Sequence, residues 1–398
     1  MRMLLETVRR NVVVVLLSLS FLSALFFVVV VPPGLPYDEP AHWANVLHIV
    51  NHGSLPKLGD KDVSYEAQMG PVAYLLDALV AVPLMFFGQE PAFYGVRMLG
   101  VFEHLLLVAL LFKLLSQITP SRPAVVLAGT TIVALNPMLL AMSSSVQNDT
   151  LSLAFALALL VVLTSATTSR RAPLAMGILA GLGVLTKITV WPVIVVVGVY
   201  LAVRRGWRSF LVFGGTIAVI SGWWFLRNEW LYGDLTGRRG VASAGYKFPA
   251  LGQVDPVALT RSAVTYLWLP DEYVRNMVHA PTLVEAAVVL LTAVGALGGL
   301  VAIIERGSLR RALSVLAATG VLAVTSWLVV TVTIQAVAFR VAYTAIPVWS
   351  LMFGIGAGKI DRVGRFVPLG IALILSLISG WFLLKVNSLT PQPFQIQF

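Results

Sequence analysis

Asp38, Glu39 and His42 bring two carboxylates and an imidazole together within five residues. Carboxylates can act as general bases, and they can also bind a divalent cation. The structural alternative is that Asp38 is the N-cap of a helix that begins at Glu39 and Pro40, because acidic residues and proline favour the first turn of a helix. Capping and catalysis are compatible. We therefore predict Asp38 and Glu39 as catalytic residues near a helix start and His42 as a substrate-binding residue.

Three cations far apart in the chain, Lys187, Arg227 and Arg340, are candidates for binding an anionic phosphate. For Lys187 the alternative is a lysine at a helix end whose charged group simply reaches solvent. Further polar candidates for binding a substrate are Tyr74, Asp149, Asn228 and Gln335. Asp149 is equally well explained as a helix N-cap.

The composition of the chain is that of a membrane protein. Of 398 residues, 58% are hydrophobic and only 12% are charged, about half the charged fraction of a soluble protein. The apolar residues form blocks of roughly 15 to 24, near the ~20 residues that span a bilayer. The net charge of +10 comes from Lys and Arg scattered between the blocks. It therefore indicates topology signals and contacts with membrane lipids, and no nucleic acid partner. The lack of Cys excludes disulfides and thiolate metal sites.

We predict an all-α polytopic protein with about eleven transmembrane helices, a cytoplasmic N-terminus and an external end of the chain. This topology places more than half of the 28 Lys and Arg residues on the cytoplasmic side. The segment from Pro71 to Phe87 is short and contains Asp77, so we predict a helix in the outer leaflet and no twelfth span. The predicted spans are 11–31, 92–115, 124–142, 150–167, 172–187, 189–203, 209–228, 282–304, 312–333, 343–357 and 366–385.

The stretch between Arg171 and Arg204 should form a short hairpin, because both basic flanks favour the cytoplasm. Each leg of ~16 residues reaches only ~24 Å, less than the hydrocarbon thickness. The turn at Lys187, Ile188 and Thr189 should then lie below the outer surface. A lysine at that depth is costly without an anionic partner, which makes Lys187 a functional candidate.

We interpret residues 1–398 as one transmembrane domain with two long external loops, 32–91 and 229–281, which carry interfacial helices. Residues 257–269 of the second loop could form such a helix. Loops held on a rigid scaffold are where chemistry tends to occur. In this topology the acidic pair, the shallow lysine and the two arginines share the outer side. Trp223 and Trp224 there fit either an aromatic belt or a substrate platform.

The order of several motifs resembles the GT-C superfamily of membrane glycosyltransferases. These motifs are the acidic pair after the first span, Gln68 to Tyr74, Gly181 to Lys187, Trp224 to Asn228 with Tyr232-Gly233-Asp234, and Gln335 to Pro347. The sequence is similar to the protein O-mannosyltransferase and aminoarabinose-transferase branch. It departs from that pattern at Gln68, where many relatives have histidine, and this weakens the argument for a metal bridging the loop.

The resemblance implies an enzyme of the cytoplasmic membrane that moves a hexose or pentose, with inversion, from a polyprenyl-phosphate donor to a glycan, lipid or protein acceptor on the periplasmic or extracellular side. It implies that Asp38 acts as the base, with Glu39 beside it, and that Lys187, Arg227 and Arg340 face the donor phosphate. No cofactor is implied with certainty, and a divalent cation stays open. The alternatives are a transporter or flippase of a lipid-linked substrate, which the lack of internal repeats disfavours, and an inactive scaffold of the same fold.

Overall fold

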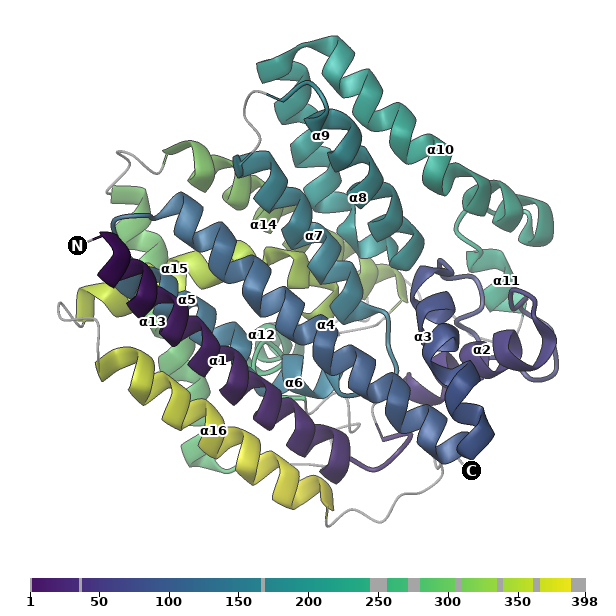
Figure 1. Ribbon diagram of the computed structural model, residues 1–398, viewed down its shortest axis with the longest axis horizontal. Coiled ribbons are helices and arrows are strands. Elements are labelled where there is room, and N and C mark those ends of the chain that lie inside the picture. Colours follow the sequence, from purple (N-terminus) through teal and green to yellow (C-terminus); the bar gives the residue numbers. More distant parts are fainter. Residues whose placement is uncertain are drawn as a thin grey trace.

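The structure is a computed structural model that describes residues 2–35, 38–165, 169–243, 256–270, 280–304, 310–334, 339–360 and 366–387. Every regular element within these ranges is a helix, as predicted. Helices satisfy all their backbone hydrogen bonds internally, which a chain surrounded by lipid requires. The long helices run roughly side by side, and the short helices α2 (Glu39–His52), α3 (Val72–Leu84) and α11 (Arg238–Ser243) lie together at one side of the bundle (Figure 1).

Within the described ranges, eight helical segments are long and apolar enough to cross a membrane, or nine if a bent pair counts as one span. The bent pair is α5 (Pro123–Ala134) with α6 (Pro137–Ser143), which meet at 54°. The chain is thus a multi-pass membrane protein. The other spans are α1 (Arg2–Val30), α4 (Gln89–Ile118), η2 with α9 (Ile188–Val190 and Trp191–Arg205), α10 (Trp207–Tyr232), α13 (Thr282–Ile304), α14 (Arg310–Ile334), η4 with α15 (Phe339–Ala345 and Ile346–Ile360) and α16 (Phe366–Asn387).

The predicted count of eleven spans is not confirmed. Each predicted span overlaps helical structure, but α7 (Asp149–Ser165) and α8 (Ala172–Thr186) have only 17 and 15 residues, fewer than the ~20 that cross a bilayer. Helix α7 begins at Asp149, and α8 ends just before Lys187. These two side chains form an ion pair. The start of α7 and the end of α8 therefore lie at the same polar cluster. The predicted turn at Lys187 is confirmed.

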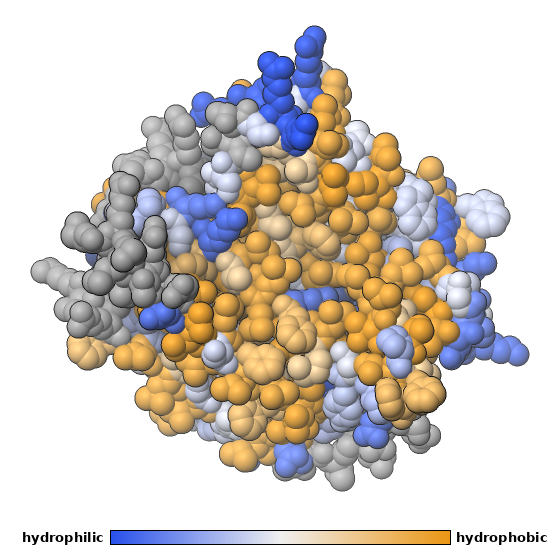
Figure 2. All heavy atoms as spheres, viewed as in Figure 1, coloured by the Kyte–Doolittle hydropathy of each residue, from blue (hydrophilic) through white to orange (hydrophobic). Residues whose placement is uncertain are grey.

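The face of the molecule seen in Figure 2 is mainly apolar, and most of its hydrophilic residues lie toward the edges. Large side chains such as Phe26, Val219 and Leu369 are exposed on three different helices. In water this surface would be unfavourable, whereas lipid chains cover it.

Close packing between helices depends on small residues, as is common in membrane proteins. Helices α13 and α15 pack tightly together. A Cβ atom on Gly298 would lie only 1.6 Å from the Met352 carbonyl oxygen, and one on Gly356 would lie 2.1 Å from that of Val294. Glycine at these two positions is therefore what lets the two backbones approach.

The apolar segment predicted to lie in the outer leaflet is helical, as α3 followed by η1 (Met85–Phe87). Leu79, Phe86 and Phe87 are exposed, whereas Asp77 is buried. An apolar exposed face with its acid turned inward suits a helix in contact with lipid.

In the second long loop, α12 (Pro256–Thr265) overlaps the predicted helix 257–269. The residues that follow it enter the bundle and do not lie on its surface. Trp268 is fully buried, its carbonyl accepts a hydrogen bond from the Met138 backbone, and the Asn136 amide donates to the Leu267 carbonyl. This segment therefore packs at the bend between α5 and α6.

Candidate active site

Asp38 lies at the N-cap position of α2, as predicted, but its side chain makes no capping hydrogen bond. Instead, Oδ1 accepts a 2.6 Å hydrogen bond from the Tyr65 hydroxyl, and Oδ2 is bonded to the Arg340 guanidinium. The carboxylate is about 95% buried. A carboxylate at this position is therefore available for chemistry, because the helix does not need it as a cap.

Arg340 connects Asp38 to a second acidic residue. The Nη1 atom of Arg340 lies 3.7 Å from Asp149 Oδ2 and 3.5 Å from the Gln147 amide oxygen. The other oxygen of Asp149 is 2.7 Å from Lys187 Nζ. The first loop, the start of α7, the end of α8 and η4 thus contribute two acids and two cations to one buried cluster. Lys187 has the anionic partner that its predicted depth required.

His42 and Glu66 complete the side of the cluster nearest α2. His42 Nδ1 lies 2.8 Å from the Tyr74 hydroxyl, which places both predicted substrate-binding residues together. The carboxylate of Glu66 is buried, and its Oε2 has no hydrogen-bond partner among the described residues.

Burial controls the charge of His42 and Glu66. It lowers the pKa of His42 to about 4, so the imidazole is neutral at neutral pH. Burial, together with the negative charge of Asp38, raises the pKa of Glu66 to about 8, so this carboxyl holds a proton at neutral pH. For Asp38, burial also acts to raise the pKa, but the charge of Arg340 and the hydrogen bond from Tyr65 outweigh it and lower the pKa to about 2. Asp38 is therefore ionised.

Asp38, His42 and Glu66 fit a divalent cation. Each offers one ligand atom, and the three atoms lie within 4.8 Å of one another. The Oε2 atom of Glu66 has no hydrogen-bond partner among the described residues, so an ion bound there would partner it. Two carboxylates and one imidazole are suitable ligands for Mn²⁺ or Zn²⁺.

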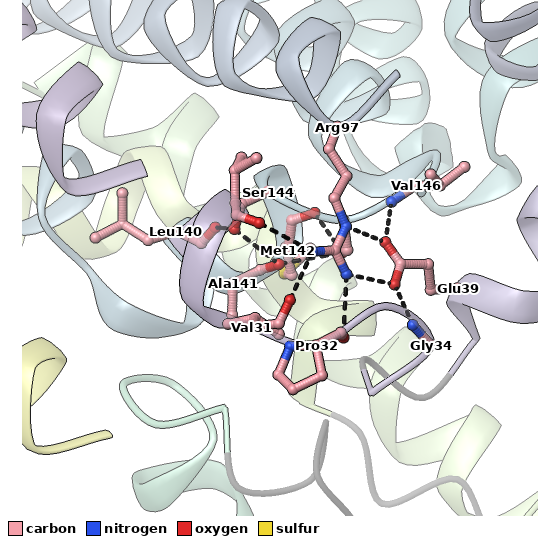
Figure 3. Close-up of polar contacts among 12 residues, drawn as sticks. Val31, Pro32, Gly34, Glu39, Arg97, Leu140, Ala141, Met142, Ser144 and Val146 are labelled. Carbon is pink, nitrogen blue, oxygen red and sulfur yellow. Dashed lines mark hydrogen bonds and ion pairs between the residues drawn. The ribbon is translucent and has the colours of Figure 1, made fainter. Parts of the chain in front are cut away.

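Glu39, predicted to be catalytic beside Asp38, has both carboxylate oxygens engaged by donors of the protein, and its catalytic role stays a prediction. Its side chain is completely buried, and its two oxygens accept four hydrogen bonds, two from Arg97 and one each from the backbone amides of Gly34 and Val146. Figure 3 shows Arg97 also pointing toward the carbonyls of Val31 and Pro32, where α1 ends, and the structure contains these hydrogen bonds. With its oxygens engaged by protein donors, Glu39 joins the first loop to α4 and to the chain before α7.

Arg227, predicted to face the donor phosphate, contacts the first loop. Its Nη2 donates a 2.7 Å hydrogen bond to the Pro56 carbonyl, and its guanidinium lies 4.4 Å from the centre of the Trp224 ring. The Asn228 amide and the Trp224 indole both donate to the Gln68 carbonyl. These three residues of α10 thus contact the first loop, and their described contacts do not include the cations and acids around Asp38. Gln335 lies outside the described residues.

The first loop approaches α8 through a glycine. A Cβ atom on Gly70 would lie 2.1 Å from the Leu185 carbonyl oxygen, two residues before Lys187. The Asn148 amide donates to the sulfur of Met69 beside it. The loop that carries Tyr65 and Glu66 is therefore held against the two helix ends that carry Asp149 and Lys187.

Three residues important to this region were not predicted from the sequence, namely Tyr65, Glu66 and Arg97. A charged residue within an apolar span is a signal of a buried polar partner, and Arg97 in α4 gives that signal. Tyr65 and Glu66 lie in a polar loop segment, where no spacing rule distinguishes them from their neighbours.

The helical bundle, with a buried polar cluster formed by its first loop, is similar to known membrane glycosyltransferases in part of its sequence and in its fold. Residues 72–223 match the family model described as dolichyl-phosphate-mannose-protein mannosyltransferase. The resemblance predicted from the motifs is thereby confirmed. The match runs from α3 into α10, and so includes Tyr74, Asp149 and Lys187 but not Asp38 or Arg340.

Solved structures share the fold. The undecaprenyl phosphate-bound ArnT of Cupriavidus metallidurans has a TM-score of 0.58 and 13% identity, over 95% of this chain and 74% of that one. The Archaeoglobus fulgidus oligosaccharyltransferase with Zn and sulfate has a TM-score of 0.53 and 13% identity, over 94% of this chain and 52% of that one. The chain thus spans about half the length of the oligosaccharyltransferase. No curated protein matches significantly.

Proposed function

We propose that the protein transfers one sugar, with inversion, from a polyprenyl-phosphate donor to a hydroxyl group of a glycan, lipid or protein on the outer face of the membrane. The observation that carries this proposal is the buried cluster in which Arg340 connects Asp38 to Asp149 and Lys187. It holds a general base beside two cations that suit a phosphate. The family match and the undecaprenyl phosphate bound by the similar ArnT support a lipid-phosphate donor.

Arg340 and Lys187 are the proposed phosphate ligands. Each is paired with a carboxylate in the structure, at distances of 2.7 Å for Lys187 and Asp149 and 3.7 Å for Arg340 and Asp149. A phosphate entering the cluster would share these cations with the acids. Because guanidinium has five N–H donors, Arg340 can keep one carboxylate contact while binding a phosphate oxygen. For Arg227 we propose a role in holding the first loop, since its contacts are made there.

The ion pair with Arg340 also sets when Asp38 acts as a base. In the structure, this pair keeps the pKa of Asp38 at about 2, which makes the carboxylate a weak base. When the donor phosphate draws Arg340 away, burial raises the pKa of Asp38, and the carboxylate becomes a stronger base. Binding of the donor therefore prepares the base, so the acceptor loses its proton only when a donor is present.

In the transfer step, Asp38 removes the proton of the acceptor hydroxyl, and the hydroxyl oxygen attacks the anomeric carbon on the face opposite the phosphate. The bond between that carbon and the phosphate oxygen breaks, and its electron pair leaves with the phosphate. Arg340 and Lys187 stabilise the charge that develops on the leaving phosphate. A divalent cation held by Asp38, His42 and Glu66 would supply additional positive charge for the phosphate.

Purified protein in nanodiscs, assayed with a panel of polyprenyl-phosphate sugars and extracted cell-envelope acceptors, tests this function. We expect the wild-type protein to release free polyprenyl phosphate and form a glycosylated product, and the Asp38→Asn variant to do neither. Donor movement across vesicles without any transfer product would instead establish a flippase. Donor binding with no product from any acceptor would indicate an inactive scaffold.

A further inference from the structure

A second cluster of metal-ligating side chains lies at the other end of α2. His48 and His52 are four residues apart, so they project from the same side of the helix, and their ring centres are 4.7 Å apart. Asp62 reaches them from the loop that follows α2. His48 is ten positions after Asp38, which corresponds to about 15 Å along the helix axis. This cluster is therefore separate from the candidate active site.

Gly53, the residue directly after α2, allows the chain to reverse its direction. Its φ of 62° lies in the left-handed region, and its N–H closes the helix on the Ile49 carbonyl. The chain then turns back, so that Ser54 and Asp60 face His48 and Asp62 faces both imidazoles. The fold thus builds the cluster from a helix end and the loop directly after it.

The distances between the side-chain atoms of the cluster suit ligands of one shared metal ion. His48 Nδ1 lies 3.1 Å from both oxygens of Asp62, and His52 Nε2 lies 3.0 Å from Oδ2. In a tetrahedral site with bonds of about 2.0–2.2 Å, neighbouring ligand atoms are separated by roughly 3.3 Å. His48 Nε2 lies 3.2 Å from the Ser54 hydroxyl. A hydrogen bond at this nitrogen can fix the orientation of the ring while Nδ1 binds the metal, as is usual for histidine ligands.

We propose that His48, His52 and Asp62 bind one divalent transition-metal ion of the Zn²⁺ type. Two imidazoles and one carboxylate favour zinc over magnesium or calcium, and the half-exposed side chains of His52 and Asp62 leave a coordination position open to solvent. Asp60, whose Oδ2 is 3.8 Å from His48 Nε2, adds negative charge nearby. The ion ties the loop to α2 only three residues before Tyr65, and so supports the segment that contacts Asp38.

Zinc binding by the full-length protein tests this proposal. The protein carries a tag without histidine, is treated with a chelator and is titrated with Zn²⁺ by calorimetry, while its melting temperature is recorded. His52→Ala and Asp62→Asn are suitable variants, because these side chains are 54% and 44% exposed and their replacement leaves the core packing intact. His279→Ala is the control for the loss of a histidine elsewhere in the sequence.

We expect the wild-type protein and the His279→Ala variant to bind zinc and to melt at a higher temperature with it. The His52→Ala and Asp62→Asn variants should each lose one equivalent of zinc, or bind that equivalent at least about tenfold more weakly. They should also lose the thermal shift. Zinc bound at another site, for example beside Asp38, would still bind to these variants, so the titration separates it from zinc bound by His48, His52 and Asp62. Equal zinc binding by the His52→Ala and wild-type proteins, or no saturable binding by the wild type, would overturn the proposal.

Discussion

Glu39 Oε2 accepts a 2.7 Å hydrogen bond from Arg97 Nη2, while its neighbour Asp38 is bonded to Arg340. Two adjacent acids therefore have partners from α4 and from η4. The reason is helical geometry, since consecutive residues at a helix start point about 100° apart. One acid joins the loop to the bundle, and the other faces the cluster proposed to be the active site.

Replacing Asp38 tests the base. We expect Asp38→Asn to lower kcat/KM by about 10²–10⁴, the usual contribution of a general base. The melting temperature should fall less than in the Glu39→Gln variant, because Arg340 keeps Asp149 as a counter-charge. Glu90→Gln is the matched control, because it removes an exposed acid from the first turn of α4, as Asp38→Asn removes an acid from the start of α2. Initial rates of sugar transfer provide the measurement. Full activity of the Asp38→Asn variant would refute the assignment.

Replacing Arg340 tests the coupling between the phosphate ligand and the base. We expect Arg340→Gln to lower kcat/KM by about 10²–10³, because a cation beside the leaving phosphate is lost. The pKa of Asp38 should rise, since burial raises it and the charge of Arg340 no longer lowers it. The acidic limb of the pH–rate profile should therefore move to higher pH. Arg340→Lys keeps the charge and should move the limb less. If the limb stays in place in Arg340→Gln, the ion pair does not control the base.

Replacing Glu39 should affect folding more than chemistry. Glu39→Gln leaves the fully buried Arg97 without its counter-charge, and breaking such a buried pair costs about 3–5 kcal/mol. We expect a clear fall in melting temperature and in the yield of folded protein. The fraction that does fold should retain most of its kcat, which separates the role of Glu39 from that of Asp38. A Glu39→Gln variant of normal stability with no activity would instead support a catalytic role for Glu39.

Gly70→Ala tests whether the first loop must contact α8. The added methyl group would meet the Leu185 carbonyl at 2.1 Å, so the loop must move away from α8. We expect a loss of about 1–3 kcal/mol in stability, as for other overpacked sites, together with a fall in kcat/KM. Gly214→Ala in α10, where a Cβ meets nothing within 4 Å, is the control and should preserve both quantities. Melting curves and transfer rates decide between the outcomes.

The buried carboxyl of Glu66 predicts how stability changes with pH when divalent cations are removed. Burial, then the charge of Asp38, raises its pKa in the folded protein to about 8 from 4.5. Between these values the folded state holds a proton that the unfolded state has released. The contribution of Glu66 to the free energy of unfolding should therefore be greatest below about pH 4.5. This contribution should be lost as the pH rises to about 8.

Melting temperatures in chelator at several pH values measure this effect. The Glu66→Gln variant, which cannot ionise, should show a flatter dependence on pH than the wild-type protein. An identical dependence in both proteins would mean that Glu66 is not buried as a neutral acid.

The sequence by itself determined the class of fold and the position of the main acid. Apolar blocks specify helices because lipid provides no hydrogen bonds for an irregular backbone, and the Pro40 pattern located a helix start at Asp38. The hairpin turn at Lys187 followed from charge and length. The number of spans did not follow, because α7 and α8, with 17 and 15 residues among those described, are shorter than a full span.

Only the tertiary structure decided which charged groups meet. Asp38 pairs with a residue 302 positions away and Glu39 with one 58 positions away, and the two acids are indistinguishable in the sequence. Arg227 belongs to the same external side in the predicted topology, yet it stacks on Trp224 and contacts the first loop. Spacing along one helix defines the direction of a side chain. The partner it meets depends on how separate helices pack, and that is set by close contacts such as Gly70 with Leu185, which no local pattern reveals.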